Sequence, residues 1–326
     1  MKRALMLALI IAVLCGAVMV NAADFPTRPI TIINPMSPGG TRDVLARTFA
    51  SIAEKMLGQP VIIVNKPGAS GMIGGLAAAQ AKPDGYTLSV TSTGDTCALE
   101  WEVTSGRKPL YSLQDFAALG SFTLSPALVV VPHNSPWRSL SDLVRDCKAK
   151  PGYYAFASGG MYGIVHIAEE ILMRSAGIKA RNVPYKGGGP ALNAVVGGHV
   201  DFSTQWLSTS IPLARGNKLR ILAVMGKERV KSIPDVPTAK EMGFDAEAHI
   251  MVGLLAPKKT PAPVLQKLRD VLGRVVKEKA FVDLVTGLGD EVNYLNGEEL
   301  TEYVEKESAD IRKIMIELAK EEKGKK

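Results

Sequence analysis

Pro35-Met36-Ser37-Pro38-Gly39-Gly40-Thr41-Arg42-Asp43 is the most informative segment for the class of fold, because it joins an apolar run to an amphipathic segment. Residues 30–33 before it are Ile-Thr-Ile-Ile, a composition typical of a buried strand. After it, apolar side chains recur every three or four residues, which predicts a helix: Leu45, Phe49, Ile52 and Met56. A strand that turns directly into a helix is the repeating unit of α/β proteins.

The paired glycines Gly39 and Gly40 allow a tight turn and leave the first N–H groups of the helix uncovered. Together with the positive end of the helix dipole, such donors can bind a carboxylate or a phosphate. Two simpler interpretations stay open at this point. The segment can be a plain strand-to-helix turn, and Asp43 can cap the helix instead of contacting a ligand.

The N-terminus has the features of an export signal. Met1-Lys2-Arg3 precedes an apolar run over residues 4–20, and Val20-Asn21-Ala22 offers small residues for cleavage before Ala23. We therefore predict a signal peptide over residues 1–22 and an exported mature protein. A retained membrane anchor is the alternative, although the run is short for a membrane span.

Composition limits the partners. The formal charge is +7, and it falls to +5 once Lys2 and Arg3 are removed with the signal peptide. No basic stripe interleaved with aromatic residues occurs, so we expect no nucleic-acid partner. A mild positive potential favours small anionic ligands. The roughly 300 remaining residues suit two domains.

The chain lacks the common enzyme motifs. Gly68-x-x-Gly71-x-x-Gly74 does not have dinucleotide spacing, and there is no phosphate loop and no Gly-x-Ser-x-Gly elbow. The four histidines are scattered, so we expect no metal site and no cofactor. We predict that the protein is not an enzyme. A secreted hydrolase with Cys97 as nucleophile and His166 as base is a remote alternative. Cys97 and Cys147 can pair, but two free thiols are favoured.

Strand and helix signals alternate in two sets, each with Gly-rich turns where strands end. Ligands of open α/β sheets gather at those ends, so we expect two lobes that close on a cleft. The expected strands are 30–33, 61–64, 86–90, 127–131, 154–157, 181–185, 200–202, 219–224 and 251–256. The expected later helices include 263–279 and 298–320.

Seven ordered motifs of the chain resemble the Bug-type receptors, the periplasmic substrate-binding proteins of tripartite tricarboxylate transporters. The resemblance covers essentially the whole mature chain. The motifs are Pro35-x-x-Pro38-Gly39-Gly40-x-x-Asp43, Asn65-Lys66-Pro67-Gly68-Ala69-x-Gly71-x-Ile73-Gly74, Pro83-Asp84-Gly85-Tyr86-Thr87-Leu88, Ala157-Ser158 with His166, Val183-Pro184-Tyr185-Lys186-Gly187-Gly188, Gly197-Gly198-x-Val200-Asp201 and Pro234-Asp235-Val236-Pro237-Thr238.

The resemblance implies an α/β, two-lobed type II periplasmic-binding-protein fold, with two mixed, mainly parallel sheets and a ligand cleft between the lobes. Lobe 1 would comprise residues 23–124 plus 250–326, and lobe 2 residues 125–249. The implied function is a monomeric periplasmic receptor that captures a small organic carboxylate by hinge closure and delivers it to integral-membrane transporter subunits. The same fold acting as the ligand-sensing subunit of a two-component sensor kinase is the alternative.

The resemblance also implies the ligand-binding loops: Ser37–Asp43 and the hydroxyl run Thr91–Thr93 in lobe 1, and Ser158–Gly163 in lobe 2. The implied binding residues are Met36, Ser37, Gly39, Gly40, Thr41, Arg42, Asp43, Thr91, Ser92, Thr93, Ser158, Gly159, Gly163, His166, Tyr185, Gln205 and Trp206.

The chain departs from the family pattern at several of these positions. Met36 replaces an aromatic residue, Gly163-Ile164-Val165 replaces a hydroxyl pair, and Gln205-Trp206 stands where an acidic residue is common. These changes favour a ligand with one carboxylate and an apolar or aromatic body.

Three side chains have two open roles each. Arg42 occupies a position that is more often small or hydroxylated in the family, and it can clamp a carboxylate or point to water, with solvent favoured. His166 is expected to be buried and structural rather than a ligand contact. Trp206 can stack on a ligand or belong to the core.

Overall fold

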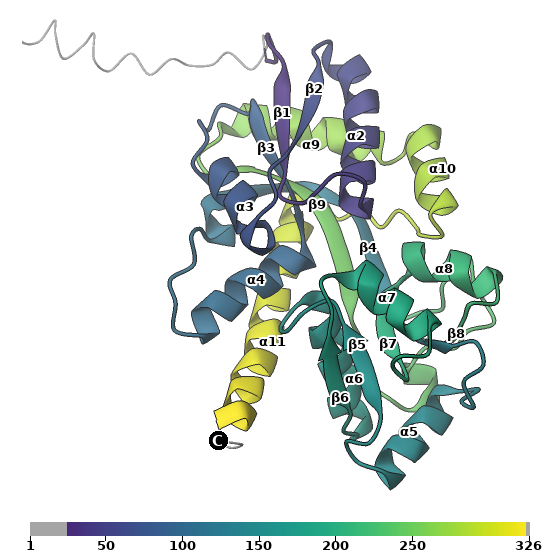
Figure 1. Ribbon diagram of the computed structural model, residues 1–326. Helices are drawn as coiled ribbons and strands as arrows, with labels where there is room; N and C mark the ends of the chain where they lie inside the picture. Colours follow the sequence, from purple (N-terminus) through teal and green to yellow (C-terminus); the bar gives the residue numbers. More distant parts are fainter. Residues whose placement is uncertain (1–24, 324–326) are drawn as a thin grey trace, which may run out of the picture.

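The structure is a computed structural model that describes residues 25–323. The predicted signal peptide, 1–22, lies outside the described residues. Strands and helices alternate along the chain, as expected of an α/β protein (Figure 1). The strands are β1 (Ile30–Asn34), β2 (Val61–Asn65), β3 (Thr87–Ser92), β4 (Phe116–Pro132), β5 (Ala155–Ser158), β6 (Arg181–Pro184), β7 (Ser203–Trp206), β8 (Leu219–Met225) and β9 (His249–Pro257).

The α-helices are α2 (Thr41–Leu57), α3 (Met72–Ala79), α4 (Thr93–Thr104), α5 (Leu140–Ala149), α6 (Ile164–Ala176), α7 (Gly188–Val196), α8 (Leu207–Arg215), α9 (Ala262–Val275), α10 (Lys279–Gly287) and α11 (Gly297–Lys323). Short 3₁₀ turns cover Ala69–Gly71, Leu113–Asp115 and Lys240–Met242.

The main sheet has the strand order β2-β1-β3-β9-β4-β7, with β8 also paired to β4. Strand β1 is parallel to β2 and β3, whereas β9 is antiparallel to β3 and β4. Strands β7 and β8 are antiparallel to β4, and β5 and β6 form a separate parallel pair. The sheets are mixed, as predicted, but the expected predominance of parallel pairing is wrong. Strand β4 leaves one half of the molecule and β9 returns to it, so these strands run in opposite directions.

Strands β4 and β9 connect the two halves of the molecule (Figure 1). The first part of β4 pairs with β9, from Phe116 to Pro126. Its last part, from Ala127, pairs with β7 and β8. In Figure 1, β1–β3, α2, α3, α9 and α10 lie at one end of these two strands, and β5–β8 with α5–α8 lie at the other.

Each half has its own apolar core. In the first, Phe49, Phe122 and Phe281 are buried together with apolar residues of β1 and β9. In the second, the two faces of β4 bury alternate residues, as a period of two requires. Val129 packs into a cluster with residues of α5 and α6, and Leu128 into one with residues of α7 and α8. These clusters agree with two lobes, whose exact boundaries stay a prediction.

A further apolar cluster spans both halves. It buries Cys97 of α4, Ile167 of α6, and Ile311 and Met315 of α11. Within this cluster, the ring of Tyr162 stacks on that of Trp101 with centroids 3.7 Å apart. Helix α6 is thereby packed against α4 and α11.

Two elements differ from the sequence-based expectation. The strand predicted at 200–202 begins instead at Ser203, and Phe202 makes only an isolated bridge to Phe156. The helix predicted at 263–279 is divided into α9 and α10, because Glu278 adopts extended dihedral angles (φ −65°, ψ 135°) and starts a new helix. Cys97 and Cys147 are free and buried, as favoured.

Candidate ligand-binding site

Helix α2 begins with uncovered N–H groups. Its N-cap residue is Gly40, with φ −78° and ψ 167°, and no side chain bonds to the cap. Within residues 25–323, the amides of Thr41 and Arg42 donate to no acceptor, whereas those of Asp43 and Val44 donate to the Gly40 carbonyl. The orphan donors lie at the positive end of a 17-residue helix, where an anion is stabilised.

Asp43 braces the loop that precedes α2. Its buried carboxylate accepts hydrogen bonds from the Gly39 amide (3.1 Å), Arg47 Nε (2.8 Å), and the side-chain amides of Asn65 (2.8 Å) and Asn34 (3.3 Å). Burial by itself would raise the pKa of Asp43, but these four hydrogen bonds lower it well below its usual range. Asp43 therefore fixes the shape of the loop from within, and the N-cap role is taken by Gly40 alone.

Arg42 is paired inside the protein. Its Nη1 lies 3.0 and 3.1 Å from the two carboxylate oxygens of Asp95, and its Nη2 contacts Ser92 Oγ. The side chains of Arg42 and Asp95 are 12% and 4% exposed. The favoured prediction that Arg42 points to water is wrong, because the capping box Ser92–Asp95 at the start of α4 places a carboxylate beside it.

The hydroxyl run Thr91–Thr93 is buried, and the hydroxyls of Ser92 and Thr93 make internal hydrogen bonds. Ser92 Oγ accepts from the Gly94 amide as well as from Arg42. Thr93 Oγ1 accepts from the Met251 amide at 3.0 Å and donates to Glu307 at 2.7 Å. Burial raises the pKa of Glu307 to about 7, although its hydroxyl donors oppose that shift. The run thus connects α4 to β9 and α11.

In the second half, the turns after β5 and β6 are held together. The Tyr185 amide donates to the Ser158 carbonyl at 2.8 Å, and the Gly187 amide donates to the Gly159 carbonyl at 3.0 Å. The N-cap residues of α6 and α7 are Gly163 and Gly187, and neither helix has a side-chain cap. Ser158 Oγ is fully buried and has no hydrogen-bond partner within the described chain. Since an unsatisfied buried hydroxyl costs about 1–3 kcal/mol, this group is suited to a ligand or a water molecule.

The other candidates of the second half are two buried, hydrogen-bonded side chains and one partly buried tryptophan. His166 is buried and its Nδ1 accepts from the Tyr162 amide at 2.9 Å, which agrees with the structural role expected of it. Gln205 is buried, and its Nε2 donates to Ser203 Oγ at 2.9 Å. Trp206 packs partly buried against the β4 core and is the uncapped N-cap residue of α8.

The N-termini of α2 and α8 meet between the two halves. Thr41 Oγ1, in the first residue of α2, lies 3.4 Å from Ser208 Oγ, in the second residue of α8. Met36, Ser37, Gly39 and Gly40 are exposed beside this contact in the chain. Sequence reasoning missed Ser208, although the hydroxyl run Ser208-Thr209-Ser210 begins at the second residue after the end of β7 and resembles the run Thr91–Thr93.

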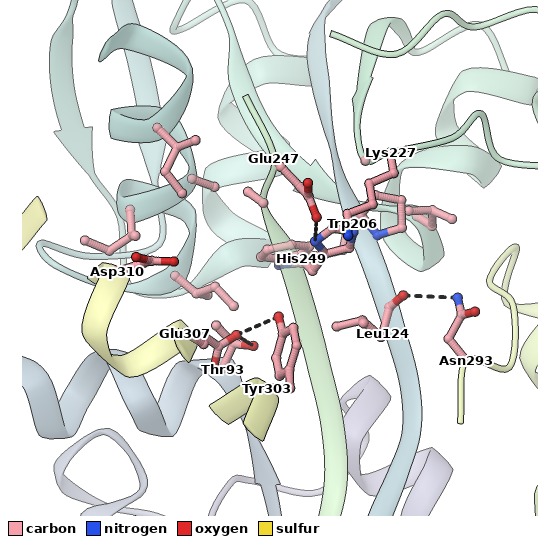
Figure 2. A pocket seen from close by; sticks show the side chains of 18 of the residues that line it. Thr93, Leu124, Trp206, Lys227, Glu247, His249, Asn293, Tyr303, Glu307 and Asp310 are labelled. Atoms are coloured by element: carbon pink, nitrogen blue, oxygen red, sulfur yellow. Dashed lines mark hydrogen bonds and ion pairs between the residues drawn. The ribbon is translucent and has the colours of Figure 1, made fainter. Parts of the chain in front are cut away.

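A cavity of about 840 Å³ is lined by residues of both halves (Figure 2). Figure 2 shows Thr93, Tyr303 and Glu307 on one side of it, joined by hydrogen bonds, and Trp206 and His249 near the connecting strands. Among residues 25–323, no cluster of three or more His, Cys, Asp or Glu side chains could hold a metal ion. No helix in that range is long and apolar enough to cross a membrane.

Comparison with known proteins shows the family of the chain. Residues 45–319 match the model of the tripartite tricarboxylate transporter family receptor. The chain belongs to this receptor family. The receptor is 32% identical to protein BugT of Bordetella pertussis over 271 residues, 83% of each chain. It is similar to MatC of Rhodopseudomonas palustris, solved with bound malate (28% identity, TM-score 0.75, 89% of the receptor and 100% of MatC). An R. palustris protein solved with adipate is also similar (27% identity, TM-score 0.78, 89% and 97% coverage).

Proposed function

We propose that this receptor is a periplasmic, monomeric, non-enzymatic protein that captures a small organic carboxylate between two lobes and presents it to a membrane transporter. The lobes would be residues 23–124 with 250–326, and residues 125–249. The observation that carries the proposal is the meeting of two uncapped helix N-termini, with Thr41 of α2 3.4 Å from Ser208 of α8.

Several features support a carboxylate between these helices. Each N-terminus offers backbone N–H groups and a partial positive charge, and each carries a hydroxyl that can donate to a carboxylate oxygen. Ser158 Oγ supplies a further unoccupied donor. The Arg42 guanidinium is neutralised by Asp95, so the anion would be held without a free cation. Two relatives were solved with the carboxylates malate and adipate.

The same surroundings suggest which of the sequence candidates would contact the ligand. The residues that would surround the ligand are Ser37, Gly39, Gly40, Thr41, Ser158, Gly159, Gly163 and Trp206, together with Ser208. Five candidates would support the binding loops without contacting the ligand, because each already makes an internal hydrogen bond: Asp43, Ser92, Thr93, His166 and Gln205.

Isothermal titration calorimetry with acetate, malate, adipate, citrate and 3-phenylpropionate tests the proposal. At least one carboxylate should bind and raise the melting temperature, since a ligand in hundredfold excess over Kd adds about 2.7 kcal/mol of stability. Lack of binding to every one of these anions would contradict it. Light scattering of the purified mature chain tests the monomeric state.

A further inference from the structure

Two methionines differ from the others in their exposure. Within residues 25–323, Met36 and Met161 are the exposed ones, at 42% and 47%. Methionine is usually buried in folded proteins, and a thioether is oxidised where a dissolved oxidant can reach it. Positions 36 and 161 are therefore the most accessible thioethers of the described chain. The methionines that are buried or partly buried are Met56, Met72, Met173, Met225, Met242, Met251 and Met315.

The two exposed methionines have equivalent positions in the two halves. Met36 lies in the loop between β1 and α2, and Met161 lies in the loop between β5 and α6. Each of these helices starts from a glycine N-cap without a side-chain cap, and the two glycines have nearly the same dihedral angles. They are φ −78° and ψ 167° at Gly40, and φ −74° and ψ 168° at Gly163. Each exposed thioether thus precedes an uncapped helix N-terminus by a few residues.

Hydrogen bonds hold both methionines in their loops. The Met36 amide donates to Asn34 Oδ1 at 3.3 Å, and its carbonyl accepts from Asn65 Nδ2 at 3.0 Å. Met161 Sδ accepts from Asn182 Nδ2 at 3.2 Å. A chemical change at either sulfur would therefore alter a side chain on a loop that is already held in place.

Oxidation would change what these side chains offer to an anion. It converts an apolar thioether into a polar sulfoxide, whose oxygen accepts hydrogen bonds and carries a partial negative charge. Within residues 25–323, the amides of Thr41 and Arg42 at the start of α2 donate to no acceptor. A sulfoxide oxygen in the preceding loop would compete with a carboxylate for such donors and repel its charge.

We propose that Met36 and Met161 are modification sites, at which a peroxide such as hydrogen peroxide forms methionine sulfoxide and thereby weakens carboxylate binding. The thioether sulfur attacks one peroxide oxygen, so that the O–O bond breaks and an S–O bond forms. The other oxygen leaves as water with both protons, so the sulfur loses two electrons and the peroxide gains them. The effect on affinity rests on the proposed function, whereas the sites of oxidation do not.

Peptide mapping by mass spectrometry tests the sites. The purified receptor is treated with dilute hydrogen peroxide for times over which circular dichroism shows no unfolding. Met36 and Met161 should then gain one oxygen atom each about ten times faster than Met56 and Met242, which are partly buried in the two cores. Equal rates at all four methionines would overturn the assignment.

Calorimetry before and after the peroxide treatment tests the consequence, with the tightest-binding of acetate, malate, adipate, citrate and 3-phenylpropionate as the probe. Oxidation should raise the Kd of the native receptor about tenfold, and methionine sulfoxide reductases A and B should reverse the change. In Met36→Leu/Met161→Leu, the same treatment should change Kd less than about twofold, because leucine is not oxidised.

Met56→Leu/Met242→Leu is the matched control, and it should lose affinity on oxidation as the native receptor does. If Met36→Leu/Met161→Leu loses as much as the native receptor, or if oxidation leaves the native Kd unchanged, the inference is overturned and the carboxylate receptor stands. If the untreated receptor binds none of the five carboxylates, the proposed function fails together with the effect on affinity. Peptide mapping then still decides whether the two sites are oxidised first.

Discussion

Gly39 and Gly40 are adjacent, but the backbone needs glycine only at the first of them. Gly39 has φ +90°, in the left-handed region that L side chains rarely adopt. Gly40 has an ordinary φ of −78°, and a Cβ built on it finds no atom within 4 Å. A side chain at position 40 is therefore compatible with the fold, and it would stand in front of the free amides of α2.

Gly40→Val should abolish carboxylate binding while the protein stays folded, because the isopropyl group fills the space through which an anion reaches the Thr41 and Arg42 amides. Calorimetry measures the affinity, and circular dichroism the fold. Gly287→Val is the matched control, since a Cβ there also meets no atom and the position lies on α10. Unchanged affinity of the Gly40 variant would show that this helix end is not the anchor.

Arg42 and Asp95 form a nearly buried ion pair, so the effect on stability of changing one should depend on whether the other is present. Arg42→Ala should lower the free energy of unfolding by about 3–5 kcal/mol, because it leaves the Asp95 carboxylate buried without its cation. The double variant Arg42→Ala/Asp95→Asn should recover part of that loss. Urea unfolding measures the free energy of unfolding of the single and the double variant.

The exposed pair Lys279–Asp283 provides the control for this measurement. Its side chains are 87% and 60% exposed, so Lys279→Ala should change stability by less than about 1 kcal/mol. If Arg42→Ala costs no more than Lys279→Ala, the Arg42–Asp95 pair is not the constraint that its burial suggests.

The surroundings of Arg42 could be predicted from the sequence only in part. Ser92-x-x-Asp95 is a recognisable capping box, and the structure has both of its hydrogen bonds. What the sequence could not provide is the position of Arg42, 53 residues earlier, against that box. By contrast, the buried, hydrogen-bonded state of His166 could be expected, because a histidine on an apolar helix face needs a partner.

At the scale of elements, Glu307 connects α11 to α4. It accepts from Thr93 (2.7 Å), Thr96 (3.1 Å) and Tyr303 (2.9 Å), and burial raises its pKa from 4.5 to about 7. The native state thus keeps a proton that the unfolded chain releases near pH 4.5. The stability that depends on this proton is full below about pH 4.5, declines as the pH rises, and is lost above about pH 7.

Glu307→Gln should remove this pH dependence. The difference in Tm between the native protein and the variant should therefore change between pH 5 and 8, with the native protein losing stability relative to the variant as the pH rises. Calorimetric scans at several pH values measure it. A difference that is constant over this range would mean that Glu307 does not titrate there.

Helix and strand positions followed from local patterns, whereas pairing directions did not. Hydrophobic periodicity predicted α2 and α6, and apolar runs predicted β1 and β2. The break between α9 and α10 at Glu278 interrupts no apolar period, so the pattern 263–279 looked continuous. The antiparallel pairing of β4 and β9 depends on where the chain re-enters the first half, which no local pattern encodes.

At the scale of the whole molecule, the two halves contact each other unequally on their two sides. On one side, Ile167, Ile311 and Met315 are buried between α6 and α11, and Arg174 Nη1 lies 2.5 Å from Glu317. Exposing each large apolar side chain costs roughly 1.5–3 kcal/mol. Between α2 and α8, Thr41 and Ser208 make one 3.4 Å contact, of the order of 1 kcal/mol net. A movement that opens the site should therefore separate α2 from α8 and turn about the α6–α11 contact.

Covalent links on the two sides should have opposite effects. Thr41→Cys/Ser208→Cys, oxidised without ligand, should bind carboxylate much more weakly than the same variant when reduced, because the disulfide keeps the helix ends from parting. Arg174→Cys/Glu317→Cys, joined by a short bismaleimide, should keep the affinity within threefold, because α6 and α11 need not separate. The parent chain controls for Cys97 and Cys147, which are buried. If the oxidised first variant binds as well as its reduced form, opening does not occur between α2 and α8, and the α6–α11 contact is not the pivot.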